Sequence, residues 1–204
     1  MHPTRLALRA WAAVALLALV ATALPLHPAQ ADQSARPVDV ALETSAGTIV
    51  VRLDVEHAPL TARNFLHYVD THAYDGATFY RTVNKRSEPE ASIEVIQGGL
   101  GSRAAGLPPI PLEPTNRSGL RNSDGALAMA RTTDPNSATT EFFIDLGNDS
   151  FLDAGGPLGP GYAVFGHVVR GMDVVRRIHD AAAAGESLTP PISILHARRV
   201  QPSR

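Results

Sequence analysis

The sequence predicts a mainly β protein that forms an antiparallel barrel or sandwich in a single domain. Short apolar or alternating segments recur along the chain and are separated by turn residues, which is typical of such sheets. Only two segments show helical spacing, and no internal repeat is present. At 204 residues, the chain has the length of one modest domain.

The first predicted elements are a β-hairpin and a helix. Residues 38–44 and 48–54 alternate apolar and polar side chains on either side of a turn at Ser45-Ala46-Gly47. Pro59 suits the first turn of a helix, where its missing N–H is not needed, so a helix is predicted over residues 59–70. The apolar face of this helix consists of Leu60, Phe65, Leu66 and Val69.

The rest of the chain adds strands and one more helix. A helix is predicted over residues 172–179, where an apolar stripe recurs at helical spacing. Residues 98–114 form a glycine- and proline-rich connection, and the alanine run at 181–184 is interpreted as a loop or a helix end. Further strands are predicted at 78–81, 93–97, 126–130, 141–146, 163–169 and 192–198.

The amino terminus carries the pattern of a secretory signal peptide. Arg5 and Arg9 precede an uncharged stretch of 15 residues, which is shorter than the roughly 20 residues that span a membrane. The small-x-small pattern that ends at Ala31 predicts cleavage there, and a retained membrane anchor is the alternative. We therefore expect a signal peptide over residues 1–31, a short leader over 32–37, and export to the periplasm.

The composition excludes several classes of protein. There is no cysteine, which rules out a disulfide framework, a zinc–thiolate site and a cysteine nucleophile. Removal of residues 1–31 takes two arginines and no acids, which moves the net charge from −2 to −4, and the remaining chain has no lysine-rich run, so nucleic acid is not expected as a partner. The histidines are scattered, and prolines follow the glycine motif at 99–104 where a dinucleotide site needs a helix. We therefore predict no metal and no organic cofactor.

Six short motifs follow one another in a fixed order after the signal segment. Each motif alone is weak evidence, but their agreement in order and spacing is specific. Together they resemble the cyclophilin family of peptidyl-prolyl cis-trans isomerases, especially its exported bacterial branch, over residues 38–200. The motifs are Phe79-Tyr80-Arg81, Val95-Ile96-Gln97-Gly98-Gly99, residues 126–131, Glu141-Phe142-Phe143-Ile144, Phe151-Leu152-Asp153 and residues 162–166.

The resemblance implies a closed eight-stranded antiparallel barrel capped by two α-helices, with a groove on its outer face for an extended X-Pro segment. Arg81 takes the position of the catalytic arginine, and Gln97 that of the glutamine that fixes the substrate backbone. The implied partners are proline-containing polypeptides that fold after export, and we expect a monomer without stable membrane insertion. The implied substrate-binding residues are Val95, Gln97, Ala130, Arg131, Glu141, Phe143, Phe151, Leu152 and Tyr162.

From the residues alone, alternatives stay open at several of these positions. An arginine two residues after Phe79 is by itself more often a solvated surface charge, and Gln97 before two glycines can be a turn residue. Phe142 and Phe143 lie on opposite faces of one strand, and the pattern does not say which of them faces the groove.

The proposed reaction can be argued from the chemistry of the X-Pro amide. Rotation breaks amide resonance against a barrier of roughly 18–20 kcal/mol, so the uncatalysed step takes tens to hundreds of seconds. In the twisted state the proline nitrogen regains a lone pair, which a fixed guanidinium stabilises more than it stabilises the planar amide. Reaching the millisecond range needs about 10⁴-fold acceleration, or roughly 5.5 kcal/mol. An arginine beside a dry apolar pocket can supply this without a covalent intermediate.

Two acidic residues depart from the family pattern. Glu94 and Val95 stand where family members carry a Phe-Met pair that lines the proline pocket, and Glu141 stands where they usually have glutamine. An unpaired carboxylate in a desolvated groove is unfavourable, so we expect Glu141 to pair with Arg81 or to lie toward solvent. These acids favour an alternative function, a peptide-binding or chaperone module with reduced catalysis. A structural barrel without a ligand is a third hypothesis.

Overall fold

The computed structural model of the protein describes residues 37–85, 90–104 and 106–201. The predicted signal peptide, residues 1–31, and all of the predicted leader except its last residue lie outside the described residues. Within the described ranges, no helix is long and apolar enough to cross a membrane.

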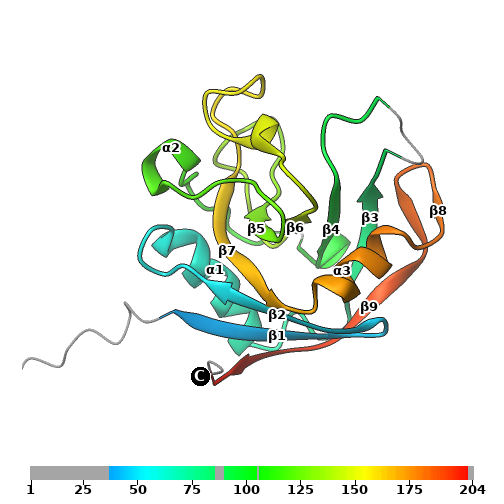
Figure 1. Cartoon of the computed structure of the whole chain (residues 1–204). Coiled ribbons are helices and arrows are strands. Elements are labelled where there is room, and N and C mark those ends of the chain that lie inside the picture. The colour runs from blue at the N-terminus through cyan, green and yellow to red at the C-terminus, as the bar shows by residue number, and fades with distance from the viewer. Residues whose placement is uncertain (1–36, 86–89, 105, 202–204) are drawn as a thin grey trace, which may run out of the picture. The chain divides into compact units, whose positions relative to one another are not determined.

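Eight strands of the described chain close into an antiparallel barrel (Figure 1). They are β1 (Val38–Thr44), β2 (Gly47–Leu53), β3 (Ala77–Val83), β4 (Val95–Gly99), β5 (Ala126–Met129), β6 (Phe142–Asp145), β7 (Ala163–Arg170) and β9 (Ser187–Val200). Neighbours follow the order β1-β2-β7-β5-β6-β4-β3-β9, and β9 pairs back onto β1, which closes the ring. The predicted barrel is therefore confirmed, and the sandwich alternative is wrong.

Two helices have the bounds that the sequence predicts. α1 (Pro59–Asp70) begins at its proline and packs against β7 and β9, while α3 (Met172–His179) packs against β2, β3 and β4. The prediction of two helices misses a third, the one-turn α2 (Thr115–Ser118). This helix follows the proline-rich connection and is too short to show an apolar period.

A small hairpin near the carboxyl terminus differs from the interpretation of the sequence. β8 (Ala183–Ala184) pairs with the start of β9 across a turn at Gly185 and Glu186, so the 181–184 run is not simply a loop or a helix end. Gly185 has a φ of +61°, a conformation that glycine adopts without strain. The turn lies against β3, because the backbone N–H of Thr82 donates to the Glu186 carbonyl oxygen (2.8 Å).

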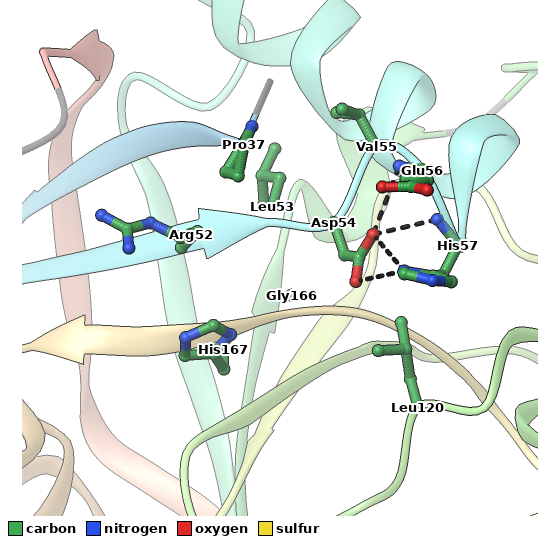
Figure 2. Close-up of a pocket in the computed structure, with 10 residues that line it drawn as sticks. All are labelled: Pro37, Arg52, Leu53, Asp54, Val55, Glu56, His57, Leu120, Gly166 and His167. Atoms are coloured by element: carbon green, nitrogen blue, oxygen red, sulfur yellow. Dashed lines mark hydrogen bonds and ion pairs between the residues drawn. The ribbon is translucent and has the colours of Figure 1, made fainter. Parts of the chain in front are cut away.

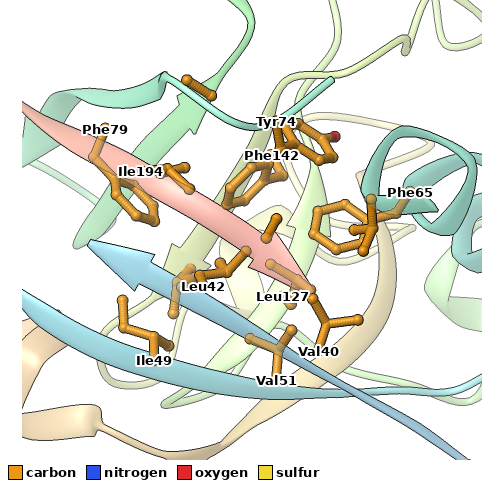
Figure 3. Close-up of a cluster of buried hydrophobic side chains, with 14 of the residues drawn as sticks. Val40, Leu42, Ile49, Val51, Phe65, Tyr74, Phe79, Leu127, Phe142 and Ile194 are labelled. Atoms are coloured by element: carbon orange, nitrogen blue, oxygen red, sulfur yellow. The ribbon is translucent and has the colours of Figure 1, made fainter. Parts of the chain in front are cut away.

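Large apolar side chains fill the barrel interior (Figure 3). Phe65 of α1 meets Phe142 of β6 edge to face, with ring centroids 5.4 Å apart at 87°. Tyr74 and Phe79 pack on the same Phe142 ring, each with a centroid distance of 5.6 Å. Because side chains occupy the interior of a barrel of this size, a polypeptide substrate has to bind on its outside.

A second, smaller apolar cluster lies on the outer face of the barrel. Strand alternation sends Phe142 into the interior and Phe143 outward, which resolves the ambiguity in the sequence pattern. β4, β5, β6 and β7 all contribute to this outer cluster. Its buried members are Val83, Val95, Ala126, Ala128, Phe143, Leu152 and Val164.

Candidate functional site

A hollow of about 120 Å³ opens on the outer apolar cluster. Eight of the ten residues that the sequence analysis selects line it, whereas Glu141 and Phe151 do not. Ile93 lines it as well, although the resemblance did not indicate that residue. The period-2 alternation of Ile93 with Val95 and Gln97 could have identified it, since all three side chains reach one face. The lining residues are Arg81, Ile93, Val95, Gln97, Ala130, Arg131, Phe143, Leu152 and Tyr162.

A β-bulge turns Arg81 onto the outer face. Phe79 points into the interior, and a regular strand would send Arg81, two residues later, the same way. On β4, however, Phe79 pairs with Gly98 and Arg81 pairs with Gln97, so Tyr80 is the extra residue of a bulge. The bulge reverses the alternation and aims Arg81 at the hollow, which is why Arg81 is not an ordinary surface charge.

Packed side chains make the apolar wall of the hollow. The rings of Phe143 and Tyr162 meet edge to face, with centroids 5.4 Å apart at 86°. Leu152 belongs to the 3-10 turn η3 (Ser150–Leu152) and is buried. Phe151, on the same turn, packs against the outer cluster but does not line the hollow.

Arg131 braces the aromatic side of the hollow. Its guanidinium carbon lies 4.6 Å from the centroid of the Tyr162 ring, a cation–π arrangement. Its Nε and Nη2 donate to the Gly161 carbonyl oxygen (3.0 and 2.8 Å), and Nη1 donates to the Thr132 carbonyl oxygen (2.8 Å). Arg131 therefore fixes the position of Tyr162 with most of its donors already occupied.

A chain of hydrogen bonds forms the polar side of the hollow. Arg81 Nη1 donates to Gln97 Oε1 (2.8 Å), Gln97 Nε2 donates to the Tyr80 hydroxyl (2.8 Å), and that hydroxyl donates to Glu141 Oε2 (2.7 Å). Both ends of the Gln97 amide are occupied, which fixes its orientation. Burial raises the pKa of Tyr80, and the nearby Glu141 carboxylate raises it further, so the hydroxyl remains protonated and donating.

Glu141 does not occupy the place that the sequence analysis expects. It neither contacts Arg81 nor extends freely into solvent. Its Oε1 accepts the backbone N–H of Gly101 (2.9 Å) and the Thr140 hydroxyl (3.1 Å), in addition to the bond from Tyr80. Gly99 permits this position, because a Cβ there would lie only 2.5 Å from Glu141 Oε1. The expectation of an Arg81–Glu141 pair is therefore wrong.

The carboxylate that pairs with Arg81 is Glu186, from the turn between β8 and β9. Arg81 Nε donates to Glu186 Oε2 at 2.5 Å, and the two side chains are 33% and 34% exposed. The sequence analysis missed Glu186, since it lies 105 positions from Arg81 in the chain. The contact arises because the β8–β9 turn lies against β3, and the sequence contains no local pattern that indicates this tertiary contact.

Glu94 is also not part of the hollow. Its carboxylate pairs with Lys85 (3.2 Å), and its backbone N–H donates to the Asp149 carboxylate (3.2 Å). Ile93 lines the hollow instead, so the expectation that an acid replaces a pocket aromatic is wrong. The pocket keeps an apolar side chain at this point.

Two buried aspartates lie close to the apolar wall. Asp145 follows Phe143 by two residues on β6, and neither of its carboxylate oxygens has a hydrogen-bond partner among the described residues. Burial raises its pKa well above the ordinary value, and the charges of Asp149 and Asp153 raise it further. Burial also raises the pKa of Asp149, to about 6. A proton shared between Asp145 and Asp149 is therefore favoured near neutral pH.

A second hollow, of about 230 Å³, shares no lining residue with the first (Figure 2). Figure 2 shows Asp54 beside His57, whose ring Nδ1 lies 2.9 Å from Asp54 Oδ2, and the backbone N–H groups of Glu56 and His57 donate to the same carboxylate. Arg52 is bound to Asp39 (2.7 Å). The bonds to Asp54 hold the turn before α1, and the Arg52–Asp39 pair joins β1 to β2. No predicted site residue lines this hollow.

The described residues show no arrangement of three or more histidine, aspartate or glutamate side chains that could hold a metal ion. The first hollow places the guanidinium of Arg81 and the amide of Gln97 beside an apolar wall.

The sequence is similar to cyclophilin type peptidyl-prolyl cis-trans isomerases over most of its length. The family model for cyclophilin type peptidyl-prolyl cis-trans isomerases matches residues 39–199. Peptidyl-prolyl cis-trans isomerase A of Dickeya dadantii is 40% identical over 167 residues, which cover 80% of this chain and 83% of that protein. Peptidyl-prolyl cis-trans isomerase B of Escherichia coli is 40% identical over 149 residues, covering 70% of this chain and 85% of that protein.

Solved structures show the same fold. A cyclophilin type peptidyl-prolyl cis-trans isomerase of Cryptosporidium parvum matches with a TM-score of 0.67 and 18% identity, covering 82% of this chain and all of that chain. The structure of that protein in the presence of the dipeptide Ala-Pro matches with a TM-score of 0.65 and 19% identity, covering 80% of this chain and 99% of that chain.

Proposed function

The chain belongs to the family of cyclophilin-type peptidyl-prolyl cis-trans isomerases, and on this premise we propose that Arg81 catalyses rotation about X-Pro bonds in exported polypeptides. The observation that carries the proposal is the position of the Arg81 guanidinium at the edge of an apolar hollow of about 120 Å³. A hydrogen-bond donor beside an apolar surface stabilises the twisted amide more than it stabilises the planar amide.

The guanidinium of Arg81 has N–H donors that can bind a substrate. Of the five N–H groups of a guanidinium, Nε is bound to Glu186 and one N–H of Nη1 to Gln97. Within the described residues the other three have no partner. A lone pair on the pyramidal proline nitrogen, which the planar amide lacks, can therefore be met by a group that is already held in place.

The hollow fits one small apolar ring. Its volume of about 120 Å³ compares with the roughly 150 Å³ of a protein cavity that binds benzene. A proline ring seated against Phe143 and Leu152 is shielded from water, which favours the less polar twisted amide. Gln97, with its amide fixed by Arg81 and Tyr80, holds the adjacent backbone of the substrate.

The site of action is the second part of the proposal. The two arginines, the short apolar stretch and the small-x-small pattern that ends at Ala31 support secretion and removal of residues 1–31. The clients are then proline-containing polypeptides that fold after export. Amino-terminal sequencing of the protein recovered from the periplasm is expected to begin at Asp32, and a protein retaining Met1 in the membrane contradicts this part.

The activity is tested by the cis–trans exchange rate of an X-Pro peptide, measured by NMR. The wild-type protein is expected to accelerate exchange, and Arg81→Ala to lose about 10²–10³-fold of that acceleration. Arg117→Ala is a matched control, because Arg117 is an exposed arginine outside the hollow. If Arg81→Ala accelerates exchange as well as the wild type does, the catalytic role of Arg81 is wrong.

The peptide-binding module with reduced catalysis remains a second candidate function. It is favoured by the pairing of Arg81 with Glu186, because an ion pair reduces the field that a guanidinium presents. Titration of the wild-type protein with the same peptide distinguishes the two functions. Saturable binding without faster exchange selects the module, whereas binding with faster exchange selects the enzyme.

A further inference from the structure

We propose that Glu186 is the positioning residue that fixes the guanidinium of Arg81 in its productive orientation, so that the β8–β9 turn is part of the catalytic machinery. This inference rests on the proposed function of Arg81 and extends it to a residue that touches no substrate. The β8–β9 turn then has a role in catalysis, although the barrel closes through β9 and β1 without β8.

Two bonds from opposite sides define the plane of the guanidinium. Glu186 accepts from Nε at 2.5 Å, and Gln97 accepts from Nη1 at 2.8 Å. An arginine side chain has many rotamers, so a single contact leaves its guanidinium mobile. With Nε and Nη1 both held, Nη2 has a defined direction and no hydrogen-bond partner in the part of the chain that the structure describes.

The backbone of Glu186 is itself held by the fold. The backbone carbonyl oxygen of Glu186 accepts the backbone N–H of Thr82, the residue next to Arg81, at 2.8 Å. Leu188, two residues further on, is buried and pairs with Ala183, which anchors the hairpin to the barrel. The turn and the bulged part of β3 therefore move as one unit, and the Glu186 side chain meets Arg81 without a long flexible approach.

Glu186 could also act by neutralising Arg81, and the structure argues that positioning outweighs this effect. Both side chains are about one-third exposed, so solvent screens the charge of the pair. Among residues 37–85, 90–104 and 106–201, none accepts a hydrogen bond from Nη2, whereas a carboxylate that disabled the arginine would occupy it. Glu141, the other carboxylate near the site, reaches Arg81 only through Tyr80 and Gln97.

The test compares three variants in the exchange assay with kcat and KM separated. Glu186→Ala is expected to lower kcat about 10-fold and to change KM by less than about twofold, because ground-state binding is unaffected. Glu186→Gln keeps an oxygen that accepts from Nε and is expected to restore kcat to within about threefold of wild type. Asp173→Asn is the matched control, since it alters another carboxylate–arginine pair, Asp173–Arg177 (2.7 Å) on α3, and is expected to leave kcat unchanged.

A second readout separates this inference from the proposed function. In ¹⁵N spectra of the uncomplexed protein, the Arg81 Nε–H signal, identified by its absence in Arg81→Ala, is expected to shift and to exchange faster with water in Glu186→Ala. An unchanged signal overturns the inference, as does an unchanged or increased kcat in Glu186→Ala or a Glu186→Gln variant as slow as Glu186→Ala. If Arg81→Ala is fully active, the proposed function fails while the spectral result still reports the contact.

Discussion

The substitution Asp145→Asn is expected to stabilise the protein above pH 6. Asp145 is buried, its two carboxylate oxygens lack partners in the described part of the chain, and Asp149 and Asp153 add negative charge. An asparagine at this position brings an NH₂ group that can donate to the Asp149 carboxylate at any pH, so the folded protein no longer has to bind a proton on residue 145.

The sign of the pH effect follows from the direction of the pKa shifts. The pKa of Asp149 is raised from 3.8 to about 6, and that of Asp145 is raised as well, so the folded protein binds more protons than the unfolded chain in this range. Stability therefore falls as pH rises from about 4 through about 6, where Asp149 releases its proton, and it continues to fall above that because the pKa of Asp145 is raised well above its ordinary value.

The pKa shift of Asp149 sets the size of the pH-dependent loss of stability in the wild type. For Asp149, the difference between 3.8 and about 6 corresponds to about 3 kcal/mol for a fully desolvated group, and partial solvent screening reduces it to about 1–2 kcal/mol. Asp145→Asn leaves this contribution of Asp149 in place and instead removes a buried carboxyl that lacks a partner, a defect that costs about 1–3 kcal/mol, so the free energy of unfolding at pH 7.5 is expected to rise by an amount in that range.

The assay is urea unfolding at several pH values between 4 and 8. The wild type is expected to lose stability across pH 4 to 6, and Asp145→Asn to show a flatter profile. Glu56→Gln, a change at an exposed carboxylate, serves as the control and is expected to follow the wild type. A less stable Asp145→Asn protein at pH 7.5, or one with an unaltered profile, would refute the shared-proton reasoning.

Three further predictions concern the hollow and its supports. Phe143→Ala is expected to cost about 3–5 kcal/mol of stability and to raise KM for X-Pro peptides, because the side chain is buried against Tyr162; chemical denaturation and the exchange assay check this, and an unchanged KM contradicts it. Tyr80→Phe is expected to lower kcat/KM about fivefold, since it leaves the Gln97 amide and Glu141 without their common partner; activity equal to wild type contradicts it. Gly98→Ala is expected to destabilise by more than about 2 kcal/mol, because its Cβ would lie 2.7 Å from the Thr78 carbonyl oxygen; a melting temperature equal to wild type contradicts it.

The barrel could be predicted because local patterns agree with the tertiary structure. Pro59 marks the first residue of α1, and the apolar stripe within 172–179 coincides with α3. The hairpin at 38–54 forms where alternation and a Ser45-Ala46-Gly47 turn predict it. These signals depend on neighbours within one or two turns of chain, and therefore they are visible in the sequence.

The polar half of the site could not be predicted in the same way. Arg81 faces outward only because a bulge at Tyr80 shifts the pairing of β3 with β4, and bulges depend on the partner strand. Glu186 reaches Arg81 across 105 positions of sequence, through the pairing of β9 with β3. The acids that the sequence did single out, Glu94 and Glu141, find other partners. Charged residues can be counted in a sequence, whereas strand register decides which way their side chains point and which partners they meet.

The most direct test of the central claim is a comparison of kcat with the peptide dissociation constant in wild type and Arg81→Ala. If Arg81 stabilises the twisted amide more than the planar one, kcat falls about 10²-fold or more while the dissociation constant for an Ala-Pro peptide changes by less than about threefold. If instead kcat is unchanged and the dissociation constant rises by the same factor as kcat/KM falls, Arg81 only binds the substrate, which would contradict the account.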